Sequence, residues 1–258
     1  MTGGFLPRWL AVPAVVGLLF LLVPLTALVA RVQWATLWSD VTSPAALSAL
    51  GLSLGTGAVA TVLCALVGIP LALLIARSPA RTAAVLRALV TVPLVLPPMV
   101  GGVALLYLFG RTGPLGALGL PFTTPAVVLA QVFVALPFLV LAVEGALRAT
   151  GVDFERTAAS LGASRVTILR RITLPLAAPG IVAGVVLCFA RAIGEFGATA
   201  LFAGNRPGVT QTMPLAIYTA FNGAGVSQGT AVALSLLLLV TAIAVLLLVR
   251  GWRPGVGR

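Results

Sequence analysis

Few residues of this 258-residue sequence carry groups that could do chemistry. All sixteen basic residues are arginines, so the chain has neither lysine nor histidine. Without lysine there is no G-x-x-x-x-G-K-[ST] phosphate loop, and without histidine there is no Ser-His-Asp triad and no common zinc site. The five acidic residues contain no obvious pair for acid–base catalysis; they are Asp40, Glu144, Asp153, Glu155 and Glu195. The sequence therefore predicts a chain that is not itself an enzyme.

The one charged pair inside an apolar stretch is Arg191 and Glu195. They stand at positions i and i+4, where side chains on one helix face meet. A charge at membrane depth costs about 2.5–3.5 kcal/mol on insertion scales, so the pair should face a bundle interior or a wet cavity. Two roles stay open. A neutralised pair that fixes helix packing is favoured, because Glu195 would repel an anion; the other role is a positive charge on an anion pathway.

Two glycines beside this pair predict close helix packing. Gly194 and Gly197 give the segment a thin surface that another helix can approach.

The two cysteines, Cys64 and Cys188, are isolated in apolar runs and have no metal-ligand or C-x-x-C spacing. We expect both to be small buried hydrophobes.

The elements that must position these residues are membrane spans. Of all residues, 60% are apolar and 8% are charged, with a mean hydropathy of +1.17. A spanning helix needs about 20 apolar residues. Charge-free runs of that length predict six spans, near 10–30, 50–76, 88–110, 125–143, 178–203 and 229–249. The fold class is therefore an all-α, polytopic membrane protein, with residues 1–258 as a single transmembrane domain.

The arginines predict the orientation of the spans. Twelve lie in one set of connections and three in the opposite set. By the positive-inside rule, the arginine-rich connections and both termini are cytoplasmic. No basic face with interleaved aromatic residues is present, so we expect the lipid bilayer as a partner and no nucleic acid.

The connection over residues 150–176 is the densest polar cluster. Asp153 is a suitable N-cap for a short helix, on which Phe154, Ala158 and Leu161 form one apolar face. Gly162 stands where a helix would end in a left-handed residue.

A second short helix should follow this glycine. Ser164 can cap it, and Arg165, Arg170 and Arg171 make its end basic. The Leu174-Pro175 and Pro179-Gly180 pairs predict a break before the fifth span. On these patterns alone, the whole segment could be an ordinary amphipathic interfacial loop.

Prolines predict interruptions in two other spans. Pro97 and Pro98 should break the third span, and Leu136-Pro137 should break the fourth. Such breaks are tolerated where neighbours or cavity water satisfy the freed backbone groups. The 97–98 break could line a pathway or be a packing kink.

The order of residues in the 150–176 connection resembles the EAA loop of ABC importer permeases. The matching residues are Glu155, Ala158, Ala159, Leu161, Gly162, Ala163 and Ser164, followed by an I-x-L-P motif that ends in Leu174 and Pro175. Arg156 and Thr157 depart from the pattern, which has Glu and Ala there. The resemblance implies that these residues, Arg156 included, form a coupling segment that docks onto an ATP-binding subunit.

A second stretch narrows the resemblance. The G-E-F-G-A-T run from Gly194, the Gly204-Asn205 pair and the M-P-L-A-I-Y-T run from Met213 are similar to permeases of molybdate importers. Sulfate/thiosulfate permeases are the nearest relatives, and the resemblance is clearest over residues 45–250.

The resemblance implies the ABC importer permease (MetI-like) fold and a role as the transmembrane subunit of an ATP-driven oxyanion importer in the cytoplasmic (inner) membrane. Molybdate is the favoured substrate, with sulfate/thiosulfate or tungstate as alternatives. The implied partners are ATP-binding cassette subunits that carry ATP and Mg²⁺, an external solute-binding protein and a second permease copy; no cofactor is expected in this chain. An ion-coupled secondary transporter or channel is the alternative of another class, disfavoured because intramembrane titratable residues are so few.

Overall fold

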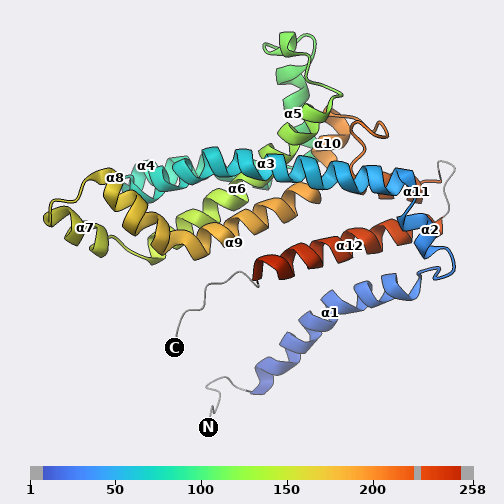
Figure 1. The fold of residues 1–258 in the computed structure, drawn as a ribbon, viewed down its shortest axis with the longest axis horizontal. Coiled ribbons are helices and arrows are strands. Elements are labelled where there is room, and N and C mark those ends of the chain that lie inside the picture. Colours follow the sequence, from blue (N-terminus) through green and yellow to red (C-terminus); the bar gives the residue numbers. More distant parts are fainter. Residues whose placement is uncertain (1–7, 224–227, 251–258) are drawn as a thin grey trace.

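The computed structural model describes residues 8–223 and 228–250, and every regular element in these ranges is a helix (Figure 1). The all-α prediction is therefore confirmed. Four helices run along the long axis of the molecule: α3 (Pro44–Arg77), α6 (Thr124–Ala149), α9 (Leu174–Ile193) and α12 (Gln228–Arg250). The predicted cytoplasmic termini, 1–7 and 251–258, lie outside the described residues.

The N-terminal helix α1 (Ala11–Ala30) has an apolar surface suited to lipid. It follows a 3₁₀ turn over Arg8–Leu10, and none of its residues is buried. Exposure of apolar side chains all around a helix is what a hydrocarbon environment favours. The short helix α2 (Leu37–Val41) connects α1 to α3.

Small residues bring α3, α6 and α9 together. A Cβ on Gly68 of α3 would lie 3.1 Å from Leu139 of α6, and one on Gly184 of α9 would lie 3.1 Å from Ala142. Gly180, one turn earlier in α9, lies against Ala146. The helices α6 and α9 are therefore antiparallel: residues later in α9 contact residues earlier in α6.

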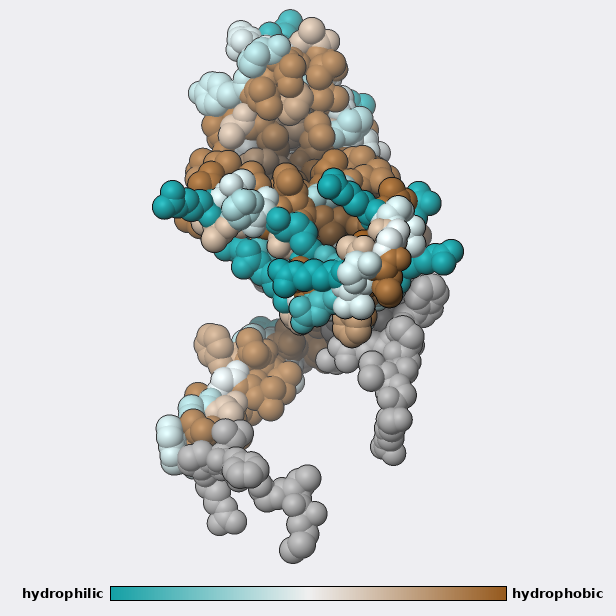
Figure 2. Space-filling view, turned by 90° about the vertical axis from the view of Figure 1, so that its left-hand side faces the viewer, coloured by the Kyte–Doolittle hydropathy of each residue, from teal (hydrophilic) through white to brown (hydrophobic). Residues whose placement is uncertain are grey.

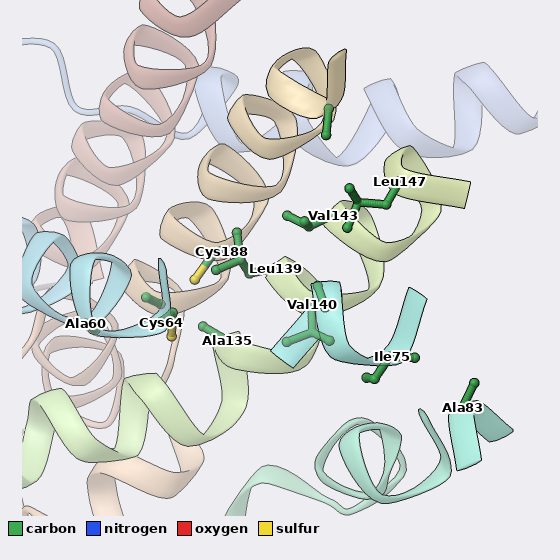
Figure 3. Packing of buried hydrophobic residues seen from close by; sticks show 13 residues of the cluster. Ala60, Cys64, Ile75, Ala83, Ala135, Leu139, Val140, Val143, Leu147 and Cys188 are labelled. Carbon is green, nitrogen blue, oxygen red and sulfur yellow. The ribbon is translucent and has the colours of Figure 1, made fainter. Parts of the chain in front are cut away.

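The main core fills this three-helix contact, with Ala60, Leu139 and Val140 fully buried (Figure 3). Cys64 of α3 and Cys188 of α9 belong to the same cluster and are 0% exposed. Both are free thiols, so the prediction of small buried hydrophobes is confirmed.

The third predicted span is broken where the prolines predicted a break. It consists of α4 (Ala80–Val95) and α5 (Pro98–Phe109), which meet at an angle of 106°. Helix α5 therefore projects away from the long bundle together with α10 (Gly197–Phe202) (Figure 1). The connection after α5 contains a 3₁₀ turn, Gly116–Leu118.

Pro137, in contrast, does not break the fourth span, and that prediction is wrong. Helix α6 is continuous from Thr124 to Ala149 with Pro137 buried inside it. Neighbouring helices and local adjustments can satisfy the backbone group that a proline leaves unpaired at membrane depth.

The fifth span differs from prediction at both ends. Helix α9 ends at Ile193, ten residues before the predicted end at Ala203, and α10 is separate. At the other end, α8 (Arg165–Ile168) and a π-helical turn over Leu169–Thr173 lead without a break into α9. The Leu174-Pro175 and Pro179-Gly180 pairs therefore do not break the chain. Pro175 lies just after the π-helical turn, and the helix continues through it although its ring nitrogen donates no hydrogen bond.

Four single helices and the bent α4–α5 pair are long and apolar enough to cross a membrane. Helix α12 adds an apolar stretch over Gly229–Val245, so the described residues are compatible with the six predicted spans. The connection between α10 and α12 contains α11 (Met213–Phe221).

Candidate functional site

The predicted coupling segment forms one polar end of the molecule (Figure 2). It consists of α7 (Asp153–Ser160), a turn, and α8. The N-cap of α7 is Val152, so the prediction that Asp153 caps this helix is wrong. Gly151 has φ +67° and reverses the chain just before Val152, which makes Asp153 the first helical residue. There its charge still favours the helix N-terminus.

The turn between the two short helices matches the sequence prediction. Gly162 has φ +84°, in the left-handed region, and its N–H donates to the Ala159 carbonyl oxygen at 3.0 Å. Ser164 caps α8, accepting from the Thr167 N–H at 3.2 Å. A Cβ at Gly162 would meet nothing within 4 Å, so the backbone conformation, and not space, requires glycine here.

The apolar face of α7 is open to solvent. Phe154 is 66% exposed and Leu161 83% exposed. They border a shallow groove of about 420 Å³, whose other lining residues are Thr157, Ala158, Arg171, Ile172, Pro175 and Leu176. Exposed apolar side chains rimmed by polar ones are typical of protein interaction surfaces. Of the remaining predicted docking residues, Arg156, Ala159, Gly162 and Ser164 are exposed, and Ala163 and Leu174 are half-buried.

Glu155 faces its own chain. Its carboxylate accepts two hydrogen bonds from Arg77 at the end of α3, at 2.5 and 3.1 Å, and one from the Thr173 hydroxyl at 2.8 Å. Partial burial raises the pKa of Glu155, but the hydrogen bonds from Arg77 and Thr173 and the Arg77 charge outweigh burial and hold the pKa below its usual value. Glu155 therefore fastens α7 to α3 and to the start of α9.

We expect the Arg77→Gln variant to release α7. Exposed ion pairs contribute up to about 1 kcal/mol, so the helix should loosen without loss of the overall fold. Limited proteolysis between residues 150 and 164 should become several-fold faster. Because the pKa of Glu155 is lowered, the contact stabilises the protein above the ordinary Glu pKa of about 4.3 and is lost as the pH falls through the lowered value. Equal cleavage of the wild type and the variant would contradict this role.

The exposed Arg81 provides the control for this experiment. It lies in the first turn of α4, four residues after Arg77, and the described residues show no ion pair for it. Cleavage of an Arg81→Gln variant should match the wild type.

Arg191 and Glu195 form the predicted ion pair, with 2.7 Å between guanidinium nitrogen and carboxylate oxygen. Glu195 is 1% exposed and lies just past the end of α9. Its other oxygen accepts from the Ala198 N–H at 2.7 Å, in the first turn of α10. Arg191 is seventeen residues along α9, or about 26 Å, so it lies close to the end of this helix.

The structure brings Gly197 and the proline break together. A Cβ on Gly197 would lie 3.1 Å from Pro98 and 3.2 Å from Met99, at the start of α5. Pro97 is the N-cap of that helix. The predicted close approach is therefore confirmed at Gly197. Gly194 instead is exposed and lines a groove of about 510 Å³ beside α11 and α12.

One charge cluster was missed from the sequence. Glu144 of α6 is 3% exposed and pairs with Arg87 of α4 at 2.5 Å and with Arg148 at 2.8 Å. The i and i+4 spacing of Glu144 and Arg148 could have predicted half of it. No local pattern points to Arg87, which is 57 residues away from Glu144.

Known proteins resemble the chain over most of its length. The molybdenum transport system permease protein ModB of Mycobacterium tuberculosis is 52% identical over 248 residues, which cover 94% of this chain and 93% of that protein. The sulfate transport system permease protein CysT of Salmonella typhimurium is 35% identical, covering 78% and 76%.

A solved structure shares the fold. It is a bacterial alginate ABC transporter in complex with an alginate pentasaccharide-bound periplasmic protein, with a TM-score of 0.74 and 19% identity, covering 93% of this chain and 91% of that chain. Residues 68–257 match the family described as the binding-protein-dependent transport system inner membrane component. The chain belongs to this family, and is therefore a multi-pass membrane permease subunit of an ABC transporter, a transport component and not a catalytic enzyme.

Proposed function

We propose that the chain is the transmembrane subunit of an ATP-driven importer that passes molybdate across the cytoplasmic membrane by alternating access. The observation that carries this proposal is the 52% identity to the molybdenum permease of M. tuberculosis across 94% of the chain. The short helices α7 and α8, which adjoin α6 and α9, are consistent with a segment that couples a partner subunit to the spans.

The energy source is a partner subunit that binds ATP and Mg²⁺. It docks on the exposed face of α7 and α8, where Phe154 and Leu161 offer apolar anchors. The helix α8, the π-helical turn and α9 form one continuous helix. A movement of α8 at the docking surface therefore displaces this whole helix, including its far end at Ile193. The fastening of α7 by Glu155 and Arg77 carries the same movement to α3.

Two copies of the chain form the pathway, and an external solute-binding protein delivers the anion. In this arrangement the arginine-rich end, with both termini, is cytoplasmic. The opposite end, which includes α11 and the 203–212 connection, receives the binding protein.

Uptake of molybdate by cells that lack their own molybdate system tests the proposal. Expression of the chain with its ATP-binding and solute-binding partners should restore uptake, and ATP depletion should abolish it. Tungstate should compete better than sulfate. Uptake that persists after ATP depletion would support an ion-coupled transporter instead.

Sulfate is the second candidate substrate, because the S. typhimurium sulfate permease is 35% identical to the chain. Preferential sulfate uptake in the same assay would assign the chain to that function.

A further inference from the structure

Gln131 of α6 is a buried polar residue with no hydrogen-bond partner among the described residues. The side chain is 0% exposed, and neither its amide nitrogen nor its amide oxygen is hydrogen-bonded in residues 8–223 and 228–250. A buried polar group that lacks its hydrogen bonds is destabilising, and polar side chains inside a membrane protein are commonly functional. The position therefore calls for an explanation in terms of what the amide binds.

The antiparallel register of α6 and α9 places Gln131 near a helix break. Gly180 lies against Ala146, and Gly184, one turn further, against Ala142 and Leu139. Continued toward the start of α6, this register places Gln131 opposite the end of α9 and Glu195 just beyond it. There the helix stops at Ile193, and the chain turns before α10.

Helix α10 brings a second unpartnered group to the same contact. The Thr199 hydroxyl is buried and has no hydrogen-bond partner in the part of the chain that the structure describes. Val127 and Val134, about one turn on either side of Gln131, belong to the same buried cluster as Ala198 and Phe202. The packing of α6 against α10 therefore brings together the two helix segments that carry these polar side chains.

We infer that Gln131 and Thr199, at the break between α9 and α10, form a contact site for the transported oxyanion. This inference rests on the proposed function. The Gln131 amide can donate two hydrogen bonds and the Thr199 hydroxyl one, and the oxygens of a tetrahedral oxyanion accept such bonds. Both donors are neutral, which suits a site that an anion must enter and leave again. Glu195 lies in the same break, and its pairing with Arg191 at 2.7 Å offsets the charge that would otherwise repel the anion.

The site is closed in this conformation and opens when the spans move. Burial of two unsatisfied side chains raises the free energy of the closed state. This cost shifts the equilibrium toward an open state, in which water and the anion can bind the two side chains. The residues thus act on both the passage of the anion and the balance between the two conformations.

Removal of the donors tests the site. The Gln131→Met variant keeps side-chain length, and the Thr199→Val variant keeps side-chain shape. Each should lower ATP-driven molybdate uptake at least tenfold in proteoliposomes while assembly with the ATP-binding subunit and the thermal unfolding midpoint stay the same or improve. The control is Thr212→Val, which removes a buried, unpartnered hydroxyl at the start of α11 and should leave uptake unchanged. Wild-type uptake by stable Gln131→Met and Thr199→Val variants would overturn the inference.

Accessibility provides a readout that does not depend on transport rates. In a Cys64→Ala/Cys188→Ala background, a Gln131→Cys variant should react with an anionic methanethiosulfonate during ATP turnover, and molybdate should slow the reaction. The neighbouring Ala130→Cys variant is the control, because Ala130 lies in the packed cluster and should stay unreactive. No reaction at position 131, or a reaction that no oxyanion slows, would contradict the site.

The two proposals fail in different ways. If the wild-type complex transports sulfate and not molybdate, the proposed substrate is wrong, and loss of sulfate uptake in Gln131→Met still supports the site. If the wild type transports molybdate and both donor variants do so equally well, the function stands and the site is wrong.

Discussion

The Arg191→Gln variant is expected to unfold more easily than the wild type, by about 3–5 kcal/mol. Glu195 is 1% exposed, and its carboxylate binds Arg191 at 2.7 Å. Without the guanidinium, the carboxylate keeps the Ala198 N–H as its other contact in the described structure. Removal of one member of a buried pair is costly because the remaining charge stays out of water. Thermal unfolding of the purified permease, together with the amount inserted in membranes, measures the loss.

The Arg191→Gln/Glu195→Gln double variant separates the two possible roles of the pair. It removes both charges, and the amide oxygen at position 195 can still accept from Ala198, so most of the lost stability should return. If the assembled double variant transports at nearly the wild-type rate, the pair fixes packing. A stable double variant with uptake reduced more than tenfold would assign the positive charge to the anion pathway. Wild-type stability of the single variant would contradict the pairing itself.

Local patterns predicted the parts of the fold that depend on near neighbours in the chain. The left-handed turn at Gly162 and the cap at Ser164 each involve residues within three positions of one another, and both are present. The break at Pro97 is also local, because successive prolines disfavour helical backbone before them. These features follow from backbone sterics and short-range hydrogen bonds.

The effect of a proline inside a packed helix depends on contacts that are distant in sequence. Pro137 and Pro175 have the residue type of a helix breaker, yet α6 continues through the first and α8 leads into α9 across the second. Packing against neighbouring helices and the π-helical turn before Pro175 absorb the missing hydrogen bonds. A sequence pattern does not contain that information.

The candidate site also has contacts that local sequence patterns predict and contacts that they do not. The Arg191–Glu195 pair was predictable because its members lie one turn apart. Arg77 and Glu155 are 78 residues apart, and the contact near Gln131 depends on the α6–α9 register. Such long-range contacts form only when the spans pack, so the sequence predicts a docking segment without showing what holds that segment in place.

The Gly162→Val variant is expected to lose ATP-driven uptake at least tenfold while its spans still insert and fold. Gly162 has φ +84°, a conformation that costs a β-branched residue about 1–3 kcal/mol or forces the turn to change. The turn sets the direction of α8 relative to α7, and the proposed docking face is built from both. Co-purification with the ATP-binding subunit, uptake and the unfolding midpoint are the measurements.

The Gly162→Asn variant is the matched control, because asparagine tolerates the left-handed region far better than valine. A Cβ at this position meets nothing within 4 Å, so the Cβ that both variants add does not clash in the free permease. The backbone argument therefore predicts that Asn keeps most of the uptake and Val does not. Equal loss in both variants would mean that the partner subunit needs the bare glycine surface for contact, and equal retention would remove the turn from the coupling mechanism. The relative uptake of the two variants thus decides whether the turn acts through its backbone conformation or through the surface that glycine leaves open.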